Sequence, residues 1–216
     1  MKYDNLRFYL SMLLSGIILT VYYVDVPLAV FIDNNVSKAV YDIFSKITVI
    51  GSFKYIVLMN ILLICFTLFK RYFSKNQIIV DKYKNLTKLL LFGALSQSIT
   101  ALVIQLLKFF FGRMRPFYYL MVNKPYHQFT FFNFDYEYVS FPSGHSAGIW
   151  AFITCLMIIF KNNKYSKLLI IPGFLISASR LILNVHYLSD IFVGGLLGIF
   201  LSGTIIKFCI KKSLNK

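Results

Sequence analysis

Two short motifs, each at an end of an apolar segment, determine how this chain is organised. K-F-F-F-G-R-M-R-P occupies residues 108–116, where one apolar run ends, and S-F-P-S-G-H occupies residues 140–145, just before another begins. Cations, small residues and a histidine therefore sit where apolar sequence gives way to polar sequence. Because about 20 apolar residues span a bilayer as a helix, we expect both motifs to lie at one membrane surface.

The rest of the sequence is typical of a membrane protein. It has 216 residues, of which 58% are hydrophobic, whereas soluble domains average about 45–50%. Candidate spans cover residues 8–23, 55–69, 89–107, 146–160, 168–185 and 191–210. We therefore predict an all-α, polytopic six-transmembrane-helix bundle forming a single domain over residues 1–216. A soluble helical protein is disfavoured, because such proteins seldom carry runs of this length.

The net charge of +15 does not indicate a nucleic-acid partner, because the cations cluster in short segments between apolar runs. Anionic lipid headgroups are the expected partners. Placing the N-terminus inside puts 15 of the 23 cations on the inner side, as the positive-inside rule requires. This predicts cytoplasmic N- and C-termini, with the 108–145 loop on the outer face.

Polar or small residues recur on one face of three spans. These sets are Gln97, Gln105 and Lys108; Ser177, Arg180 and Asn184; and Asp190, Gly194, Gly198 and Ser202. Hydrocarbon offers polar side chains no hydrogen-bond partner, and small residues allow helices to approach closely. We expect these faces to turn inward, towards a site at the outer end of the bundle.

Two connecting segments leave alternatives open. Residues 36–44, in the first outer connection, mix polar and apolar residues at helical spacing, which fits an interfacial amphipathic helix or a short helix packed over the bundle. Ten aromatic residues lie between 117 and 138, and they could form a lid against lipid tails or an interfacial cap. We predict that His127, in this loop, is not catalytic.

A third motif, S-R-L-I-L-N-V-H-Y-L-S-D, occupies residues 179–190. A charge such as Arg180 within a span costs about 2.5–3.5 kcal/mol and is usually functional or paired. His186 and Asp190 are four residues apart, so on a helix they would share a face. The carboxylate could then fix the imidazole tautomer and free the other nitrogen to act as nucleophile or base. Capping or packing would also explain this pair.

The residues before the fourth span have the features of an anion site. Ser143 and Gly144 precede His145 at an expected helix N-terminus, whose free N–H groups bind anions; Ser143 as a simple N-cap is the alternative. Lys108 and Arg115 would add two cations on the same side. A cluster of positive groups needs an anion, and phosphate suits Arg and Lys.

Taken together, the three motifs resemble the signatures of the type-2 phosphatidic acid phosphatase superfamily, in order and spacing. This resemblance implies that His186, oriented by Asp190, attacks phosphorus to form a phosphohistidine. It also implies that His145 protonates the leaving group and then activates water. Phosphate oxygens would be held by Lys108, Arg115, Ser143, Gly144 and Arg180. Neither a metal nor another cofactor is expected, and no carboxylate cluster suited to magnesium or calcium is evident.

We therefore expect an integral membrane phosphatase that hydrolyses a lipid phosphate or pyrophosphate. Candidate substrates are undecaprenyl pyrophosphate, phosphatidylglycerol phosphate, phosphatidic acid and lipid A phosphates. The alternatives are a phosphotransferase and a non-catalytic protein that binds or transports lipid phosphates. A composition rich in Lys, Asn, Ile and Phe is typical of an AT-rich bacterial genome, and we expect the protein to lie in a bacterial cytoplasmic membrane. The sequence leaves the oligomeric state open.

Overall fold

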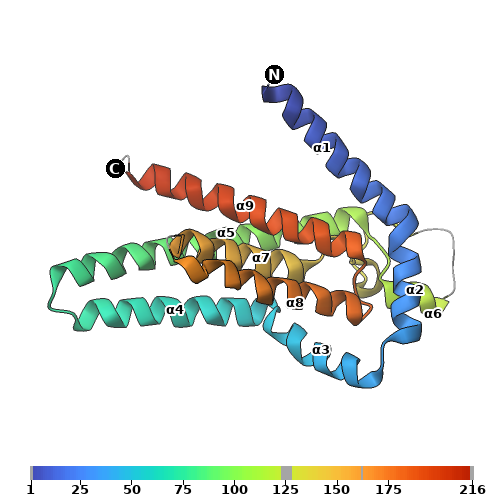
Figure 1. The fold of residues 1–216 in the computed structure, drawn as a ribbon, viewed down its shortest axis with the longest axis horizontal. Helices are drawn as coiled ribbons and strands as arrows, with labels where there is room; N and C mark the ends of the chain where they lie inside the picture. Colours follow the sequence, from blue (N-terminus) through green and yellow to red (C-terminus); the bar gives the residue numbers. More distant parts are fainter. Residues whose placement is uncertain (1, 123–127, 162, 215–216) are drawn as a thin grey trace.

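The protein is an elongated bundle of helices (Figure 1). A computed structural model describes residues 2–122, 128–161 and 163–214, and within these ranges it contains no named β-strand. The α-helices are α1 (Lys2–Leu19), α2 (Asp25–Asn35), α3 (Lys38–Ile50), α4 (Phe53–Phe73), α5 (Gln77–Phe111), α6 (Pro116–Val122), α7 (Gly144–Ile159), α8 (Ile170–Ile182) and α9 (Leu188–Leu214). A π-helical turn, η1 (Thr20–Val24), joins α1 to α2, and two 3₁₀ segments are η2 (Tyr136–Tyr138) and η3 (Lys164–Leu169).

The predicted all-α membrane bundle is confirmed. Five helical segments are long and apolar enough to cross a membrane: Phe8–Asn35, Phe53–Phe73, Gln77–Phe111, Lys164–Ile182 and Leu188–Leu214. The remaining predicted span, residues 146–160, corresponds to the shorter apolar helix α7. With 16 residues, α7 is about 24 Å long, less than the roughly 30 Å of hydrocarbon in a bilayer. It lies in the middle of the bundle, against α4, α5, α8 and α9.

The small-residue seam on α9 is what allows α7 to pack so closely. A Cβ atom added to Gly194 would overlap the carbonyl oxygen of Ser143, and one added to Gly198 would overlap that of Ala147. One turn further on, the Ser202 hydroxyl donates to the Ala151 carbonyl at 3.0 Å. The predicted inward face of this helix is therefore confirmed, and it brings the start of α9 directly against the start of α7.

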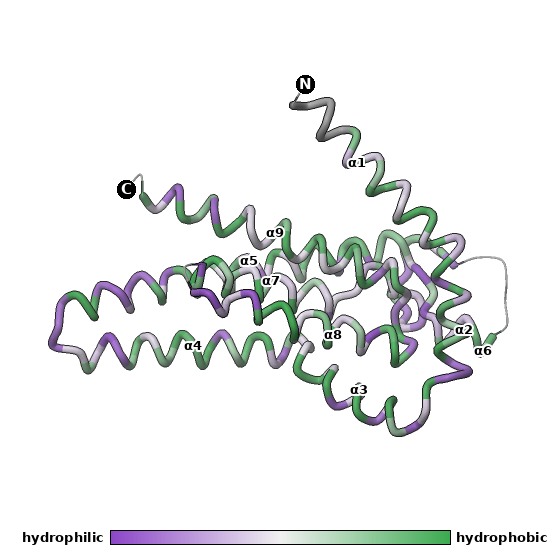
Figure 2. The backbone as a smooth tube through the Cα atoms, viewed as in Figure 1, coloured by the Kyte–Doolittle hydropathy of each residue, from purple (hydrophilic) through white to green (hydrophobic). Residues whose placement is uncertain are grey.

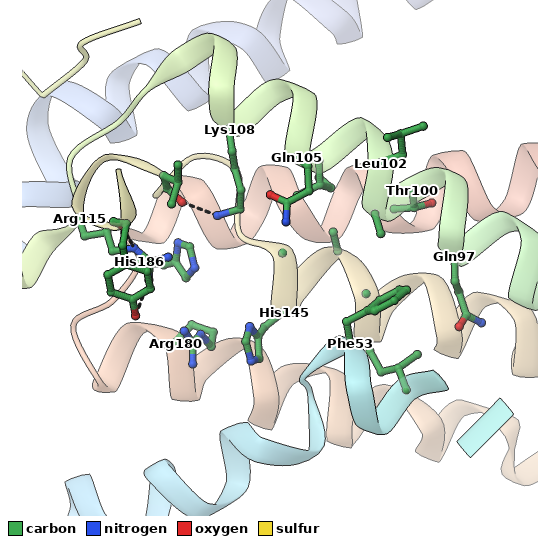
Figure 3. Close-up of a pocket in the computed structure, with 18 residues that line it drawn as sticks. Phe53, Gln97, Thr100, Leu102, Gln105, Lys108, Arg115, His145, Arg180 and His186 are labelled. Atoms are coloured by element: carbon green, nitrogen blue, oxygen red, sulfur yellow. Dashed lines mark hydrogen bonds between the residues drawn. The ribbon is translucent and has the colours of Figure 1, made fainter. Parts of the chain in front are cut away.

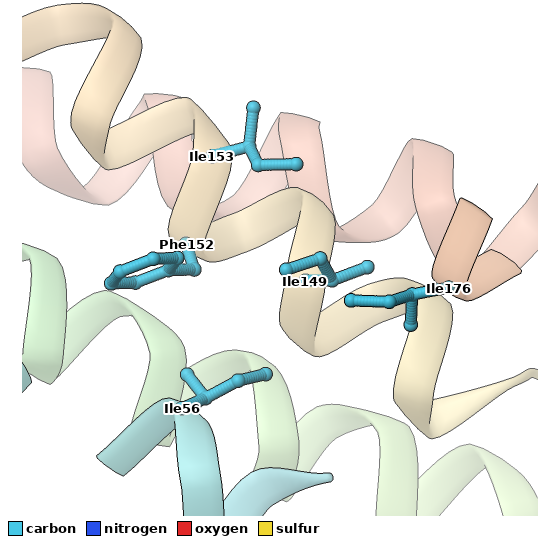
Figure 4. Packing of buried hydrophobic residues seen from close by; sticks show 5 residues of the cluster. All are labelled: Ile56, Ile149, Phe152, Ile153 and Ile176. Carbon is cyan, nitrogen blue, oxygen red and sulfur yellow. The ribbon is translucent and has the colours of Figure 1, made fainter. Parts of the chain in front are cut away.

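Apolar packing around α7 completes the core. Ile149, Phe152 and Ile153 of α7 contact Ile56 of α4 and Ile176 of α8 (Figure 4). Side chains buried deeper in the spans pair across helices, as membrane burial requires. The Asn60 amide donates to Gln97 at 2.7 Å, and a hydrogen bond of 2.9 Å joins the hydroxyls of Ser96 and Ser202.

The first span is longer than the sequence predicted. Helical structure continues through η1 and α2 to Asn35, whereas we expected the span to end at Tyr23. Helix α1 projects away from the bundle, while α2 lies across the end that carries the motifs (Figure 1). Helix α3, which includes most of the predicted amphipathic segment, packs against α8 and α4. This agrees with the alternative of a helix packed over the bundle.

The two ends of the bundle differ in character (Figure 2). The connection between α4 and α5 is hydrophilic, with Lys70 and Arg71 in the last turn of α4. Helix α5 has 35 residues and is about 52 Å long, so it must extend beyond the hydrocarbon. All three sequence motifs lie at the opposite end, and the sidedness of the two ends remains a prediction from the cation count.

Candidate active site

The three motifs meet around one cavity of about 700 Å³ (Figure 3). Its polar end is lined by Lys108, Arg115, His145, Arg180 and His186, the five positive or protonatable side chains singled out in the sequence. They come from the end of α5, the segment after it, the start of α7, the end of α8 and the turn before α9. Residues up to 78 positions apart in the sequence therefore face one space, as predicted.

The end of α5 aims two of these cations. Gly112 ends the helix in the left-handed conformation at φ 51°, which glycine adopts without steric cost. The chain then reverses, and Arg115 lies beside the same cavity as Lys108. The Lys108 ammonium donates to the carbonyl oxygen of Val139, so the loop before α7 fixes its position.

Arg115 is held by the second half of the aromatic loop. Its Nε donates to the Tyr136 carbonyl at 2.8 Å, and its guanidinium lies over the Tyr136 ring, 4.0 Å from the centroid. Burial lowers the pKa of Arg115, but an arginine side chain stays protonated in proteins. Sequence reasoning missed Tyr136, because one tyrosine among ten loop aromatics carries no distinguishing signal.

At the start of α7, the Ser143 N–H donates to the carbonyl of Asp190 at 2.9 Å. This amide, which we expected to meet phosphate, is therefore occupied by α9. The buried Ser143 hydroxyl has no hydrogen-bond partner among the described residues. Gly144 and His145 both line the cavity, and they form the first turn of a 16-residue helix whose N-terminus favours anions.

Arg180 occupies the last turn of α8 and points into the cavity near His145 (Figure 3). Its Nη1 donates to the Thr48 hydroxyl of α3 at 2.7 Å. The amphipathic helix therefore orients a cation of the site. Thr48 was not singled out, since nothing in the sequence relates two residues 132 positions apart.

His186 and Asp190 meet, but not on one continuous helix. His186 precedes α9, which begins at Leu188, and its Nδ1 lies 3.6 Å from Asp190 Oδ2. Ser140 bridges them: its hydroxyl donates to Asp190 Oδ2 at 2.5 Å and lies 3.4 Å from His186 Nδ1. The Tyr187 N–H donates to the same carboxylate oxygen at 2.9 Å.

The surroundings of His186 favour its neutral form. Burial lowers its pKa well below the usual value, the carboxylate of Asp190 opposes this, and Lys108 and Arg115 lower the pKa further. A neutral imidazole has one nitrogen with a free electron pair. His186 is therefore electronically suited to act as a nucleophile towards a group bound by the surrounding cations.

Behind the pair lies a buried ion cluster that sequence reasoning did not assign. Arg113, fully buried, contacts Asp190 Oδ1 at 2.5 Å and Asp25 Oδ2 at 2.8 Å. Burial lowers the pKa of Arg113, but Asp190 and Asp25 raise it more, to a net value above the ordinary one. A lone aspartate at the end of an apolar run was the available signal for Asp25, because acids in spans are usually paired or functional.

The described part of the aromatic loop covers the end of α5. Phe109 stacks on Phe134 with centroids 4.1 Å apart, while Phe131, Phe132 and Phe134 remain largely exposed. Tyr126 and His127 lie outside the described residues. Within the described ranges, no group of three or more His, Cys, Asp and Glu side chains could hold a metal ion.

Comparison with known proteins identifies the family of this chain. The family model of the PAP2 superfamily matches residues 85–213, which include all three motifs, so the chain belongs to that superfamily. No curated protein sequence matched the chain.

Two solved structures share the fold. The crystal structure of Aquifex aeolicus LpxE is 22% identical, with 86% of this chain and 96% of that chain covered and a TM-score of 0.60. The crystal structure of a transmembrane PAP2 type phosphatidylglycerolphosphate phosphatase from Bacillus subtilis is 18% identical, with 97% of both chains covered and a TM-score of 0.61. The chain is thus a polytopic membrane member of the PAP2 superfamily.

Proposed function

We propose that the protein is a phosphatase that removes a phosphate group from a membrane lipid through a phosphohistidine on His186. The observation that carries this proposal is the common cavity: three cations, two histidines and a helix N-terminus face it. The two solved structures described above, which share its fold, include a phosphatidylglycerolphosphate phosphatase. A buried neutral histidine that faces three cations fits a nucleophile better than it fits a non-catalytic binding role.

The shape of the cavity favours a lipid over a soluble phosphate ester. Beyond the charged end, the lining becomes mainly apolar, with Phe53, Ile56 and Ile104. It reaches Gln97 of α5, which is 11 residues from Lys108 and so about 16 Å away along the helix. A headgroup bound by the cations would leave its apolar chain along this wall, where its burial adds affinity.

Each site residue has a role in this mechanism. Lys108, Arg115 and Arg180 neutralise the phosphate oxygens, and their effect grows as negative charge develops in the transition state. His186 forms the bond to phosphorus, and the bond to the lipid oxygen breaks. His145 donates a proton to the departing oxygen and later removes one from the water that hydrolyses the phosphohistidine. The Gly144 N–H, on the cavity wall, completes the phosphate contacts. The Ser143 hydroxyl is buried and does not line the cavity, so its contact with phosphate stays a prediction.

The test is phosphate release by purified protein from a panel of lipids: phosphatidic acid, phosphatidylglycerol phosphate, undecaprenyl pyrophosphate and lipid A phosphates. His186→Ala and His145→Ala should each lose at least about a hundredfold in activity, while His127→Ala, which removes the third histidine, should retain it. Full activity in His186→Ala would refute the nucleophile assignment. Phosphorylated acceptor in place of free phosphate would identify a phosphotransferase instead.

We further propose that the site faces the outer leaflet of a bacterial cytoplasmic membrane, with both termini in the cytoplasm. The cation count supports this sidedness. In intact spheroplasts, an externally added lipid phosphate that cannot cross the membrane should be dephosphorylated. Hydrolysis that begins only after the cells are lysed would reverse the orientation.

A further inference from the structure

Three buried charges form a continuous cluster behind the nucleophile. Arg113 lies between two carboxylates, with Nη1 2.5 Å from Asp190 and Nη2 2.8 Å from Asp25. Ser189 connects the two ends, because its hydroxyl donates to Asp25 and accepts from Arg113 Nη1 at 2.7 Å. All three charged side chains are 0% exposed. Burial of three charges is costly, so the cluster calls for an explanation beyond attachment of one helix.

The geometry connects this cluster to His186 through the two oxygens of one carboxylate. Asp190 Oδ1 contacts Arg113, whereas Oδ2 contacts Ser140 and faces His186 Nδ1. Arg113 itself does not line the cavity. It therefore cannot touch a substrate there, and any effect it has on the reaction must pass through Asp190.

Asp25 comes from a part of the chain outside the residues that match the family model, 85–213. It is the first residue of α2 and follows directly on the π-helical turn η1. Such turns are rare and often occur at functional sites. A second contact from α2, in which the Asn184 amide donates to the Ala29 carbonyl at 3.1 Å, holds the helix against the same end of the bundle.

We propose that Asp25 and Arg113 are positioning residues for the nucleophile, because Asp25 shares the Arg113 guanidinium with Asp190 and so sets how much negative charge faces His186. This inference rests on the proposed function of His186. The arrangement leaves Asp190 fixed on both sides, with its attraction to the imidazole weakened by Arg113. Asp25 limits that weakening, since it draws part of the guanidinium charge towards itself.

The other groups facing His186 are cationic or protonatable. They are Lys108 from α5, Arg115 from the following segment, His145 from α7 and Arg180 from α8, all on the same cavity. Among the described side chains, none of them forms a hydrogen bond or ion pair with Arg113 or Asp25. A change in the ion cluster therefore reaches His186 through Asp190, with the cavity cations left in place.

Two charge-removing substitutions should have opposite effects. Arg113→Gln takes a cation from Asp190, so its carboxylate attracts a proton on His186 more strongly and the pKa of His186 rises. Asp25→Asn leaves Arg113 entirely to Asp190, so the pKa of His186 falls. A charge at 4–6 Å shifts a pKa by about one to three units; since this effect passes through one carboxylate, we expect shifts of roughly half a unit or more.

The experiment measures the acid limb of kcat/KM and, on the same proteins without substrate, the ¹⁵N resonances of the histidine rings. The chain has three histidines, so His→Gln variants assign the signals. We expect the apparent pKa of the acid limb and the pKa of His186 to rise in Arg113→Gln and to fall in Asp25→Asn. Arg113→Lys keeps the charge and should leave both near their wild-type positions.

Ser202→Ala is the matched control. It removes a buried hydrogen bond of 2.9 Å to Ser96, far from the ion cluster, and should lower the Tm without moving either titration. The proposal would be overturned if Arg113→Gln and Asp25→Asn changed the Tm equally but left the pKa of His186 and the acid limb where they are in wild type. The ion cluster would then serve only to attach α2 to the bundle. If Arg113→Gln does not fold, the direction of the shift in Asp25→Asn decides.

The two proposals fail in different ways. A wild-type protein that releases no phosphate from any lipid of the panel would contradict the proposed function. The ring resonances would still report whether Asp25 and Arg113 control His186. An active wild-type protein whose His186 titration is the same in all variants would keep the proposed function and refute the positioning role.

Discussion

Substitution of one glycine tests how the site depends on the packing of α9 against α7. Gly194 faces the backbone of Ser143, and a Cβ atom there would overlap the carbonyl oxygen and press on the backbone nitrogen at 3.2 Å. Backbone atoms cannot rotate away as a side-chain end can. In Gly194→Ala the two helices must therefore separate, and this separation occurs next to the Ser143–Asp190 hydrogen bond.

The expected magnitude combines two opposing terms. Overpacking a tight contact costs about 1–3 kcal/mol, and alanine in place of glycine favours a helix by about 0.5–1 kcal/mol. The net loss in the free energy of unfolding is then about 1–2 kcal/mol. For a chain of this size, each kcal/mol lowers the Tm by about 2–4 °C, so the Tm of Gly194→Ala should fall by roughly 2–8 °C.

The assay is thermal unfolding of the purified variant in detergent, followed by phosphate release at a temperature where it stays folded. Gly203→Ala on the same helix is the control, because its new Cβ meets Thr154 Cγ2 at an ordinary 3.7 Å. The control should keep its activity, and its Tm should be unchanged or higher by about 1–4 °C because of the helix propensity of alanine, whereas Gly194→Ala should have a lower Tm and lower activity. A Gly194→Ala protein that matches wild type in Tm and activity would refute the close approach of α9 to α7.

Other predictions address single groups of the site. Ser140→Ala removes a hydrogen bond to a charged acceptor worth about 1.5–3 kcal/mol, and kcat should fall about tenfold to a hundredfold; an unchanged kcat would show that Asp190 orients His186 unaided. Tyr136→Ala should raise KM by freeing Arg115, whereas Tyr136→Phe keeps the ring and the main-chain acceptor and should resemble wild type. Burial lowers the pKa of His186 below the ordinary histidine pKa of about 6.5, so the nucleophile stays neutral at pH values below about 6.5. In a plot of kcat/KM against pH, the fall in activity on the acid side should therefore occur below about pH 6.5. Phosphate release should persist after treatment with EDTA, and loss that added magnesium restores would contradict a reaction without metal.

The sequence predicted most of the bundle because membrane burial leaves strong signals. Apolar runs mark the spans, and polar residues within them must find partners, which is why Gln97, Ser202 and Arg180 turned out to face other helices. The glycine seam of α9 could be predicted because only small residues permit close helix contact. These signals depend on spacing along one element, and spacing is visible in a sequence.

What the sequence could not predict are contacts between elements far apart along the chain. Arg113 stands in the first motif without an assigned role, and only the fold brings it to Asp25, 88 positions away. The N–H of Ser143 seemed free because a sequence does not show that Asp190 would accept from it. The length of the first span was also missed, since Asp25 and Asn35 look like residues of a loop unless the partner of Asp25 is known.

The charges around the cavity favour one kind of phosphate. Lys108, Arg115 and Arg180 line it, and the ion cluster behind them carries one net negative charge. Apart from the histidines, these six residues leave two positive charges, which match the charge of about −1.5 to −2 on a phosphate monoester. A diester carries only one negative charge and would leave one positive charge uncompensated. Phosphatidic acid should therefore be hydrolysed much faster than a phosphodiester lipid with the same acyl chains, and equal rates of phosphorus–oxygen cleavage in the two would contradict this charge argument.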